Sequence, residues 1–166
     1  MSFWRHYYHI VWATKARKPL ITAQIEARLH GYLVSRAGEL DAHVYAINGV
    51  ADHVHVVASI PPKHAVSDFV KALKGASAHF VNHVIRPDEQ FAWQRGFGSF
   101  TLGESKLVFA MRYVDEQKTR HVNQDLNAWL EKMAEFDEGP DGTDLRTSTA
   151  IREDSPTYDT PGDSPF

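Results

Sequence analysis

The order in which two hydrophobic periods alternate along the chain constrains the fold most strongly. Runs of aromatic and β-branched residues predict strands at residues 5–13, 43–47, 53–60 and 97–102. Apolar residues at helical spacing predict helices at residues 22–37, 65–85 and 104–120, and a shorter one at 123–135. This order favours an α+β fold, namely a ferredoxin-like split βαβ antiparallel sheet with helices on one face and an added C-terminal helix.

Local signals set the expected ends of these elements. Thr22 can cap the first helix at its N-terminus, and Gly38 can stop it. The dipeptide Asn48-Gly49 is a turn signal that would close the second strand. Pro61 and Pro62 would end the third strand, because proline cannot donate a hydrogen bond to a β-ladder.

The composition changes near residue 136 and divides the chain into two parts. Residues 1–136 hold all the periodic segments and predict one domain. Residues 137–166 are rich in Gly, Pro, Ser, Thr and Asp and are expected to form an acidic, disordered tail. From Glu135 onwards there are nine acidic and two basic residues, so residues 1–134 carry 16 basic against 12 acidic residues. A body with this positive balance can sit on a phosphate backbone.

Several classes of protein are excluded by what the sequence lacks. The chain has no cysteine, which rules out disulfides and thiolate metal sites and fits a cytoplasmic protein. No apolar run is long enough to predict a membrane span. Residues 1–9 have no apolar signal core, so export is not expected.

The sharpest local feature is a pair of histidines on the third predicted strand. Side chains alternate along a strand, so His53 and His55 project from one face, and Val54 and Val56 project from the other. Two imidazoles two residues apart on a rigid strand can share a metal ion. The alternative is a pair of strand histidines without a ligand.

A second feature lies on the predicted helix at residues 104–120. Tyr113 and Gln117 are one helical turn apart and flank its apolar stripe. A helix packed on the sheet through that stripe could hold both side chains near the histidine face. The amide oxygen of Gln is a hard metal ligand, and the phenolic oxygen of Tyr is a known type of covalent nucleophile. Alternatively, both are ordinary residues of an amphipathic helix.

Taken together, these segments resemble the single-tyrosine transposases of the HUH superfamily, which move small insertion sequences and repetitive extragenic palindromes. The resemblance covers about residues 4–136. Its motifs are Tyr8-His9-Ile10-Val11-Trp12-Ala13-Thr14-Lys15 with Arg17 and Pro19, Asp52-His53-Val54-His55, Trp93-Gln94-Arg95-Gly96-Phe97-Gly98, and Tyr113-Val114 with Gln117 and His121. One departure is that His121 is followed by Val122, where the family often has a second histidine. We therefore leave His121 out of the expected ligand set.

The resemblance implies a site and a reaction. His53, His55 and Gln117 would hold one Mg²⁺ or Mn²⁺ ion, and Tyr113 on the added C-terminal helix would be the nucleophile. The enzyme would cleave and rejoin single-stranded DNA with hairpin ends through a 5′-phosphotyrosine intermediate. Many members of the family are homodimers that share sites between subunits and others act as monomers; we expect a homodimer here.

DNA binding needs further residues. Basic and aromatic side chains that could contact phosphates or unpaired bases are Lys15, Arg17, Lys18, Lys71, Lys74, Arg95, Trp12, Trp93 and Phe97. Three other interpretations stay open: a nicking protein that the host has retained to act on repetitive palindromes, a non-catalytic module that binds single-stranded nucleic acid, and a small metal-dependent hydrolase.

Overall fold

A four-stranded antiparallel sheet forms the centre of the protein, seen here in a computed structural model that describes residues 2–128 and 130–133. Its strands are β1 (Tyr7–Ala13), β2 (His43–Val50), β3 (His53–Ser59) and β4 (Gly98–Leu102), in the order β2-β3-β1-β4. The long helices are α1 (Ala23–Glu39), α2 (Val66–Phe80) and α3 (Leu107–Asp115), followed by the short α4 (Gln117–Asn123). Single turns of helix lie at Lys15–Arg17 (η1), Val81–Ile85 (η2) and Glu104–Lys106 (η3). The expected tail at residues 137–166 lies outside the described residues.

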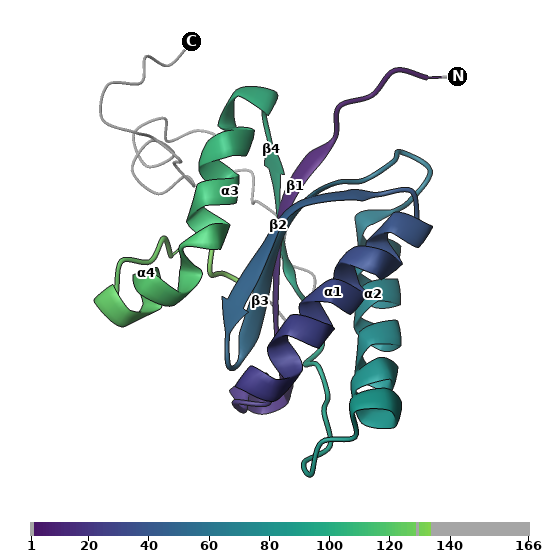
Figure 1. The fold of residues 1–166 in the computed structure, drawn as a ribbon. Helices are drawn as coiled ribbons and strands as arrows, with labels where there is room; N and C mark the ends of the chain where they lie inside the picture. The colour runs from purple at the N-terminus through teal and green to yellow at the C-terminus, as the bar shows by residue number, and fades with distance from the viewer. Residues whose placement is uncertain (1, 129, 134–166) are drawn as a thin grey trace.

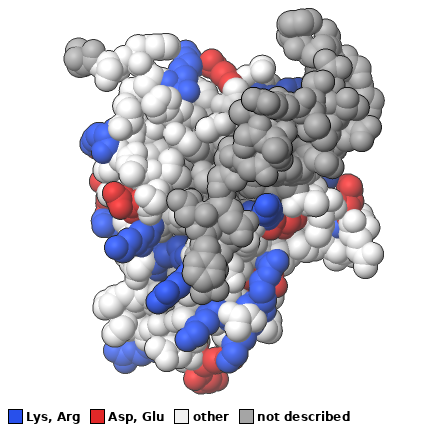
Figure 2. Space-filling view, turned by 180° about the vertical axis from the view of Figure 1, so that it is seen from behind, with Lys and Arg blue, Asp and Glu red and all other residues white. Residues whose placement is uncertain are grey.

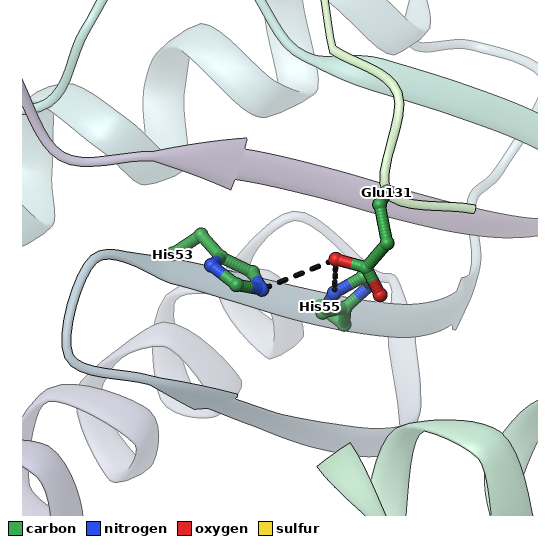
Figure 3. Close-up of side chains that lie close together, drawn as sticks. All are labelled: His53, His55 and Glu131. Carbon is green, nitrogen blue, oxygen red and sulfur yellow. Dashed lines mark hydrogen bonds and ion pairs between the residues drawn. The ribbon is translucent and has the colours of Figure 1, made fainter. Parts of the chain in front are cut away.

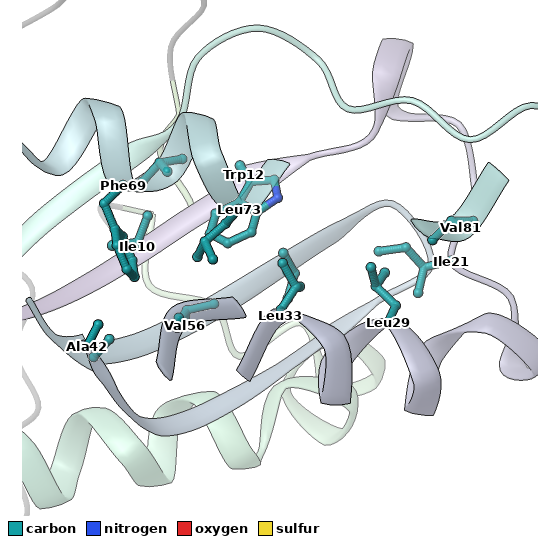
Figure 4. Packing of buried hydrophobic residues seen from close by; sticks show 14 of the residues in the cluster. Ile10, Trp12, Ile21, Leu29, Leu33, Ala42, Val56, Phe69, Leu73 and Val81 are labelled. Carbon is teal, nitrogen blue, oxygen red and sulfur yellow. The ribbon is translucent and has the colours of Figure 1, made fainter. Parts of the chain in front are cut away.

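The two faces of the sheet are covered by different helices (Figure 1). Helices α1 and α2 pack on one face, and the main core lies between them and the sheet. Side chains of β3 enter this core at every second position, as the alternation predicted. Figure 4 shows Ile10 and Val56 of the sheet packed with Leu33 of α1 and Leu73 of α2. This thick apolar layer makes the sheet a rigid support for whatever lies on its other face.

The opposite face carries α3 and α4, so the α+β, ferredoxin-like expectation with an added helix is confirmed (Figure 1). A smaller apolar cluster joins α3 to the sheet; it contains Ala46, Val57, Ala110, Tyr113, Val114 and Leu130. Val57 lies on the same face of β3 as His53 and His55. Helix α3 therefore packs beside the two histidines.

Two expected boundaries were wrong. Asn48 and Gly49 do not turn but continue β2, where they pair with His55 and Val54. A Cβ atom on residue 49 would lie 2.2 Å from the carbonyl oxygen of His53, so the glycine serves this tight strand pairing rather than a turn. Helix α1 runs on through Gly38 to Glu39, because Gly38 keeps ordinary helical backbone angles there.

The C-terminal helices also differ from expectation. The predicted helix at residues 104–120 is divided at Glu116, which leaves Tyr113 on α3 and makes Gln117 the first residue of α4. The predicted helix at 123–135 does not form in residues 124–128 or 130–133, because Gln124 adopts a left-handed conformation with φ of 56° that ends α4. Within the described part of the chain, no helix has both the length and the apolar character needed to cross a membrane.

Candidate active site

Two histidines and one carboxylate converge on the α3 face of the sheet. His53 and His55 point from β3 toward Glu131, which belongs to the segment that crosses this face after α4 (Figure 3). The Oε2 atom of Glu131 lies 3.3 Å from Nε2 of His53 and 3.2 Å from Nε2 of His55. Both imidazoles are almost fully buried. The three side chains each offer a ligand atom within 4.8 Å of the others, a spacing that one metal ion can bridge.

Tyr113 is attached to this cluster through its hydroxyl group. The phenol donates a hydrogen bond of 2.8 Å to Oε1 of Glu131 and accepts one of 3.1 Å from the backbone amide of Asn127. Its ring centroid lies 6.1 Å from that of His55. Burial raises the pKa of the Tyr113 phenol well above its usual value, and the charge of Glu131 adds to this, although the Asn127 amide opposes it. The phenol is therefore protonated at neutral pH.

Glu131 is the site residue that sequence reasoning missed. It lies outside regular secondary structure, in a segment expected to be helical, and a single glutamate there carries no motif. Leu130, which is fully buried, anchors the segment in the α3 cluster. Burial by itself would raise the pKa of Glu131, but the hydrogen bonds from His53 and His55 outweigh it and hold that pKa well below its usual range.

Gly98 of β4 leaves room for residues 130–133 to pack closely against the sheet. A Cβ atom at position 98 would lie 2.0 Å from the carbonyl oxygen of Lys132 and 2.9 Å from Cγ1 of Val11. Only glycine leaves room for the backbone of Lys132 to pass so close to the sheet. Glu131, one residue earlier, is thereby held over the histidines.

Gln117 borders the site from the start of α4. Its side chain is fully buried, and Nε2 donates a hydrogen bond of 3.3 Å to the carbonyl oxygen of Tyr113. Its Oε1 atom is buried without a hydrogen-bond partner among the described residues, an arrangement that is costly unless the oxygen meets a ligand. His121, which we left out of the expected ligand set, has its Nε2 atom 3.1 Å from Nε2 of His53.

The Nδ1 atom of His53, which faces away from Glu131, is held by Asp52 of the β2–β3 turn and lies near Arg17 of η1. Nδ1 of His53 lies 2.6 Å from Oδ1 of Asp52 and 3.4 Å from Nη1 of Arg17. A carboxylate on this nitrogen fixes the ring and turns Nε2 toward the site. Arg17, expected to contact DNA, is exposed and thus sits at the rim of the histidine cluster.

The other expected DNA contacts fall in two places. Lys15 and Lys18 are exposed on the turn after β1, where Lys18 forms an ion pair of 3.0 Å with Glu89. A groove of about 600 Å³ runs between α2 and the loop before β4; it is lined by Lys71, Lys74, Trp93, Arg95 and Phe97 among others. Seen from behind, the molecule presents Lys and Arg side chains over much of its lower half (Figure 2).

Two of the residues expected to contact DNA have roles in the fold. The ammonium group of Lys74 donates hydrogen bonds of 2.7 Å and 2.8 Å to the carbonyl oxygens of Gln94 and Gly96 and so ties down the groove loop. Burial lowers the pKa of Lys74 to about 8. The expectation that Trp12 stacks on DNA bases was wrong, because Trp12 lies in the main core with no exposed surface.

Comparison with known proteins identifies the family. The family described as "Transposase IS200 like" matches residues 2–117, a segment that contains His53, His55, Tyr113 and Gln117 but not Glu131. The ISDra2 transposase TnpA of Deinococcus radiodurans is 30% identical over 115 residues, which are 66% of this chain and 82% of that protein. A transposase for insertion sequence element IS200 from Salmonella typhimurium is 28% identical over 107 residues, which are 61% of this chain and 70% of that protein.

Solved structures agree with this result. A crystal structure of a candidate transposase from Deinococcus radiodurans superposes with a TM-score of 0.56 at 26% identity, covering 70% of this chain and 95% of that one. A REP-associated tyrosine transposase bound to a REP hairpin superposes with a TM-score of 0.53 at 15% identity, covering 78% and 76%, and this likeness concerns the fold alone. The chain belongs to the IS200-like transposase family and is an enzyme of the DNA-cleaving type.

Proposed function

We propose that this transposase cleaves and rejoins single-stranded DNA through a covalent bond to Tyr113. One observation carries the proposal: the Tyr113 hydroxyl bonds Glu131 at 2.8 Å, and the same carboxylate contacts both strand histidines at 3.2 and 3.3 Å. The Glu131 carboxylate thus contacts both Tyr113, a residue type that can act as a nucleophile, and the two histidines, which can bind a metal ion.

The proposed metal ligands are His53, His55 and Glu131, together with the amide oxygen of Gln117. Imidazole nitrogens together with carboxylate and amide oxygens suit Mn²⁺ or Mg²⁺. The buried Oε1 atom of Gln117, which has no hydrogen-bond partner among the described residues, fits such a role. A bound divalent ion would supply Lewis-acid polarisation of the scissile phosphate.

Tyr113 and Glu131 provide the nucleophile and the acceptor of its proton in the proposed cleavage step. As the phenolic oxygen of Tyr113 bonds to phosphorus, its proton passes to Oε1 of Glu131, which already accepts its hydrogen bond. The raised pKa of the phenol and the lowered pKa of Glu131 keep the proton on Tyr113 until that bond forms. The bond from phosphorus to the 3′-oxygen breaks, and this oxygen takes a proton from water. The product is a 5′-phosphotyrosine, which a different 3′-hydroxyl can attack to reseal the strand.

The proposed substrate is single-stranded DNA that carries a hairpin, and the proposed location of the reaction is the cytoplasm. The groove with Lys71 and Arg95 offers cations for the phosphates, and Trp93 and Phe97 line its apolar part. A fold relative is described with a REP hairpin bound. The same cleavage and rejoining would act on the hairpin ends of a mobile element and on repetitive palindromes that a host has retained, so both substrates fit the proposal.

The proposed site is built within one chain, because Tyr113 and both histidines contact the same Glu131. A homodimer remains a prediction, which light scattering behind gel filtration would test. Since one chain supplies all these residues, dimerisation is not required for cleavage in this arrangement.

A single incubation distinguishes the proposed reaction from its alternatives. Labelled single-stranded DNA with a hairpin is incubated with the protein, with and without Mn²⁺, and then denatured. We expect a labelled adduct that survives denaturation and needs the ion. Binding without any adduct would favour a non-catalytic module. Turnover of a small phosphodiester substrate by Tyr113→Phe would favour a hydrolase that activates water.

A further inference from the structure

A third strand histidine, His9 of β1, lies directly behind His55. The two strands pair in an antiparallel register that puts Val11 opposite His55 and Val57 opposite His9, so both histidines share the α3 face of the sheet. Nε2 of His9 lies 2.8 Å from Nδ1 of His55. Neither side chain has exposed surface. We infer that His9 is a positioning residue that holds the His55 ring so that its Nε2 atom faces the metal ion; the inference rests on the proposed metal site.

The hydrogen bond fixes the direction of the second ring nitrogen. Nδ1 of His55 is engaged by His9, and Nε2 of the same ring lies 3.2 Å from Glu131 on the site side. When Nε2 gives its lone pair to an ion, the ring hydrogen must sit on Nδ1, and Nε2 of His9 then accepts it. A histidine at position 9 can also donate in the reverse direction when the site holds no ion. The same contact is therefore kept in both states.

The two metal-binding histidines are held in different ways, and this explains why residue 9 is a histidine. His53 is held by Asp52, whose side chain is 31% exposed. His55 lies deeper, where an unpaired charge would be costly. A neutral imidazole gives His55 a hydrogen-bond partner there without adding a charge to the interior of the sheet.

His9 also touches the nucleophile. Its ring centroid lies 5.9 Å from that of Tyr113 and 6.2 Å from that of Phe100, so the imidazole is packed between α3 and β4. An apolar side chain could fill this space, but it would leave Nδ1 of His55 buried without its partner. Packing alone therefore does not account for the residue. His9 links the metal ligand on β3 to the ring of the nucleophile.

The test compares two substitutions of His9 with a matched control. His9→Leu fills the space but cannot hydrogen-bond, whereas the amide of His9→Gln can accept from or donate to His55. His79→Gln makes the same chemical change at an exposed position on α2. Mn²⁺ affinity is measured by calorimetry on the full chain without DNA. We expect His9→Leu to weaken Mn²⁺ binding by about 10- to 100-fold, His9→Gln to restore most of it, and His79→Gln to match the unmodified protein. Metal-free binding of hairpin DNA should not change in any variant.

The results separate this inference from the proposed function. Wild-type Mn²⁺ affinity in a folded His9→Leu, together with loss of Mn²⁺ binding in His55→Ala, would refute the positioning role and leave the metal site intact. Wild-type affinity in His55→Ala would overturn the metal site and the inference with it. Should His9→Leu fail to fold, nitrogen NMR of the Mg²⁺-saturated, unmodified protein decides. A hydrogen on Nδ1 of His55 that is hydrogen-bonded to Nε2 of His9 supports the inference, and a hydrogen on Nδ1 without that bond overturns it while leaving the metal site intact.

Discussion

Replacing Gly98 by alanine should disturb the site without touching any of its side chains. The φ angle of Gly98 is not in the left-handed region, so the effect of a methyl group is purely steric. The new Cβ would lie 2.0 Å from the carbonyl oxygen of Lys132, and the segment must withdraw by at least about 1 Å to reach a tolerable contact. Glu131 contacts His53 and His55 at 3.3 and 3.2 Å, so a shift of this size breaks both contacts.

The expected magnitude follows from these two effects. Overpacking typically costs about 1–3 kcal/mol, and a lost hydrogen bond to a charged group costs about 1.5–3 kcal/mol. The segment around Lys132 can relieve the overpacking by moving away, but it then loses the hydrogen bonds of Glu131, so the two costs do not add in full. We therefore expect the free energy of unfolding to fall by about 2–3 kcal/mol in total. Denaturation by urea measures this loss. Calorimetry should also show weaker Mn²⁺ binding, by about tenfold.

The control is another glycine. A Cβ atom at Gly31 of α1 would meet nothing within 4 Å, so Gly31→Ala should stabilise the protein by up to about 1 kcal/mol through helix propensity. Unchanged stability and unchanged Mn²⁺ affinity in Gly98→Ala would refute the argument that this glycine seats Glu131.

Three further predictions concern charge. In the metal-free protein, burial lowers the pKa of His55 below 6.5, so below that pH the unfolded chain binds a proton that the folded chain does not. The free energy of unfolding should therefore fall as the pH drops, by up to about 1.4 kcal/mol per pH unit. A free energy of unfolding that urea denaturation finds unchanged with pH would contradict this. Glu131→Gln keeps the shape of the side chain but removes its charge, so Mn²⁺ affinity in calorimetry should fall by at least about tenfold, and an unchanged affinity would remove Glu131 from the ligand set. Replacing Lys71 and Arg95 by alanine should weaken hairpin binding and reduce the salt dependence of the affinity by about one ion for each residue; Lys63→Ala, which only breaks an ion pair with an aspartate, is the control.

The parts of the fold that follow local periodicity could be predicted from the sequence. The alternation along residues 53–60 placed Val54 and Val56 on one face of the strand and His53 and His55 on the other; in the structure the two valines pack against α1 and α2. Tyr113 lies beside His55, and Gln117 contacts the backbone of Tyr113, although the two residues belong to two short helices. Both are consequences of chain geometry over a few residues.

What depends on contacts between distant segments could not be predicted. Glu131 reaches the histidines because Lys132 passes close over Gly98, and nothing in the residues around Glu131 indicates that approach. Gly49 was interpreted as a turn residue because Asn-Gly is a turn signal, whereas it serves the close pairing of β2 with β3. His9 belonged to a recognisable motif, but its contact with His55 depends on the register of two strands.

The covalent link to Tyr113 is the central claim, and mapping that link tests it most directly. The unmodified protein and Tyr113→Phe are each incubated with Mn²⁺ and a hairpin-bearing single strand, digested with protease and nuclease, and examined by mass spectrometry. The account predicts a nucleotide attached through its 5′-phosphate to the peptide that contains Tyr113, and no adduct in Tyr113→Phe although that variant still binds the DNA. An adduct on any other residue, or one that persists in Tyr113→Phe, would contradict the account.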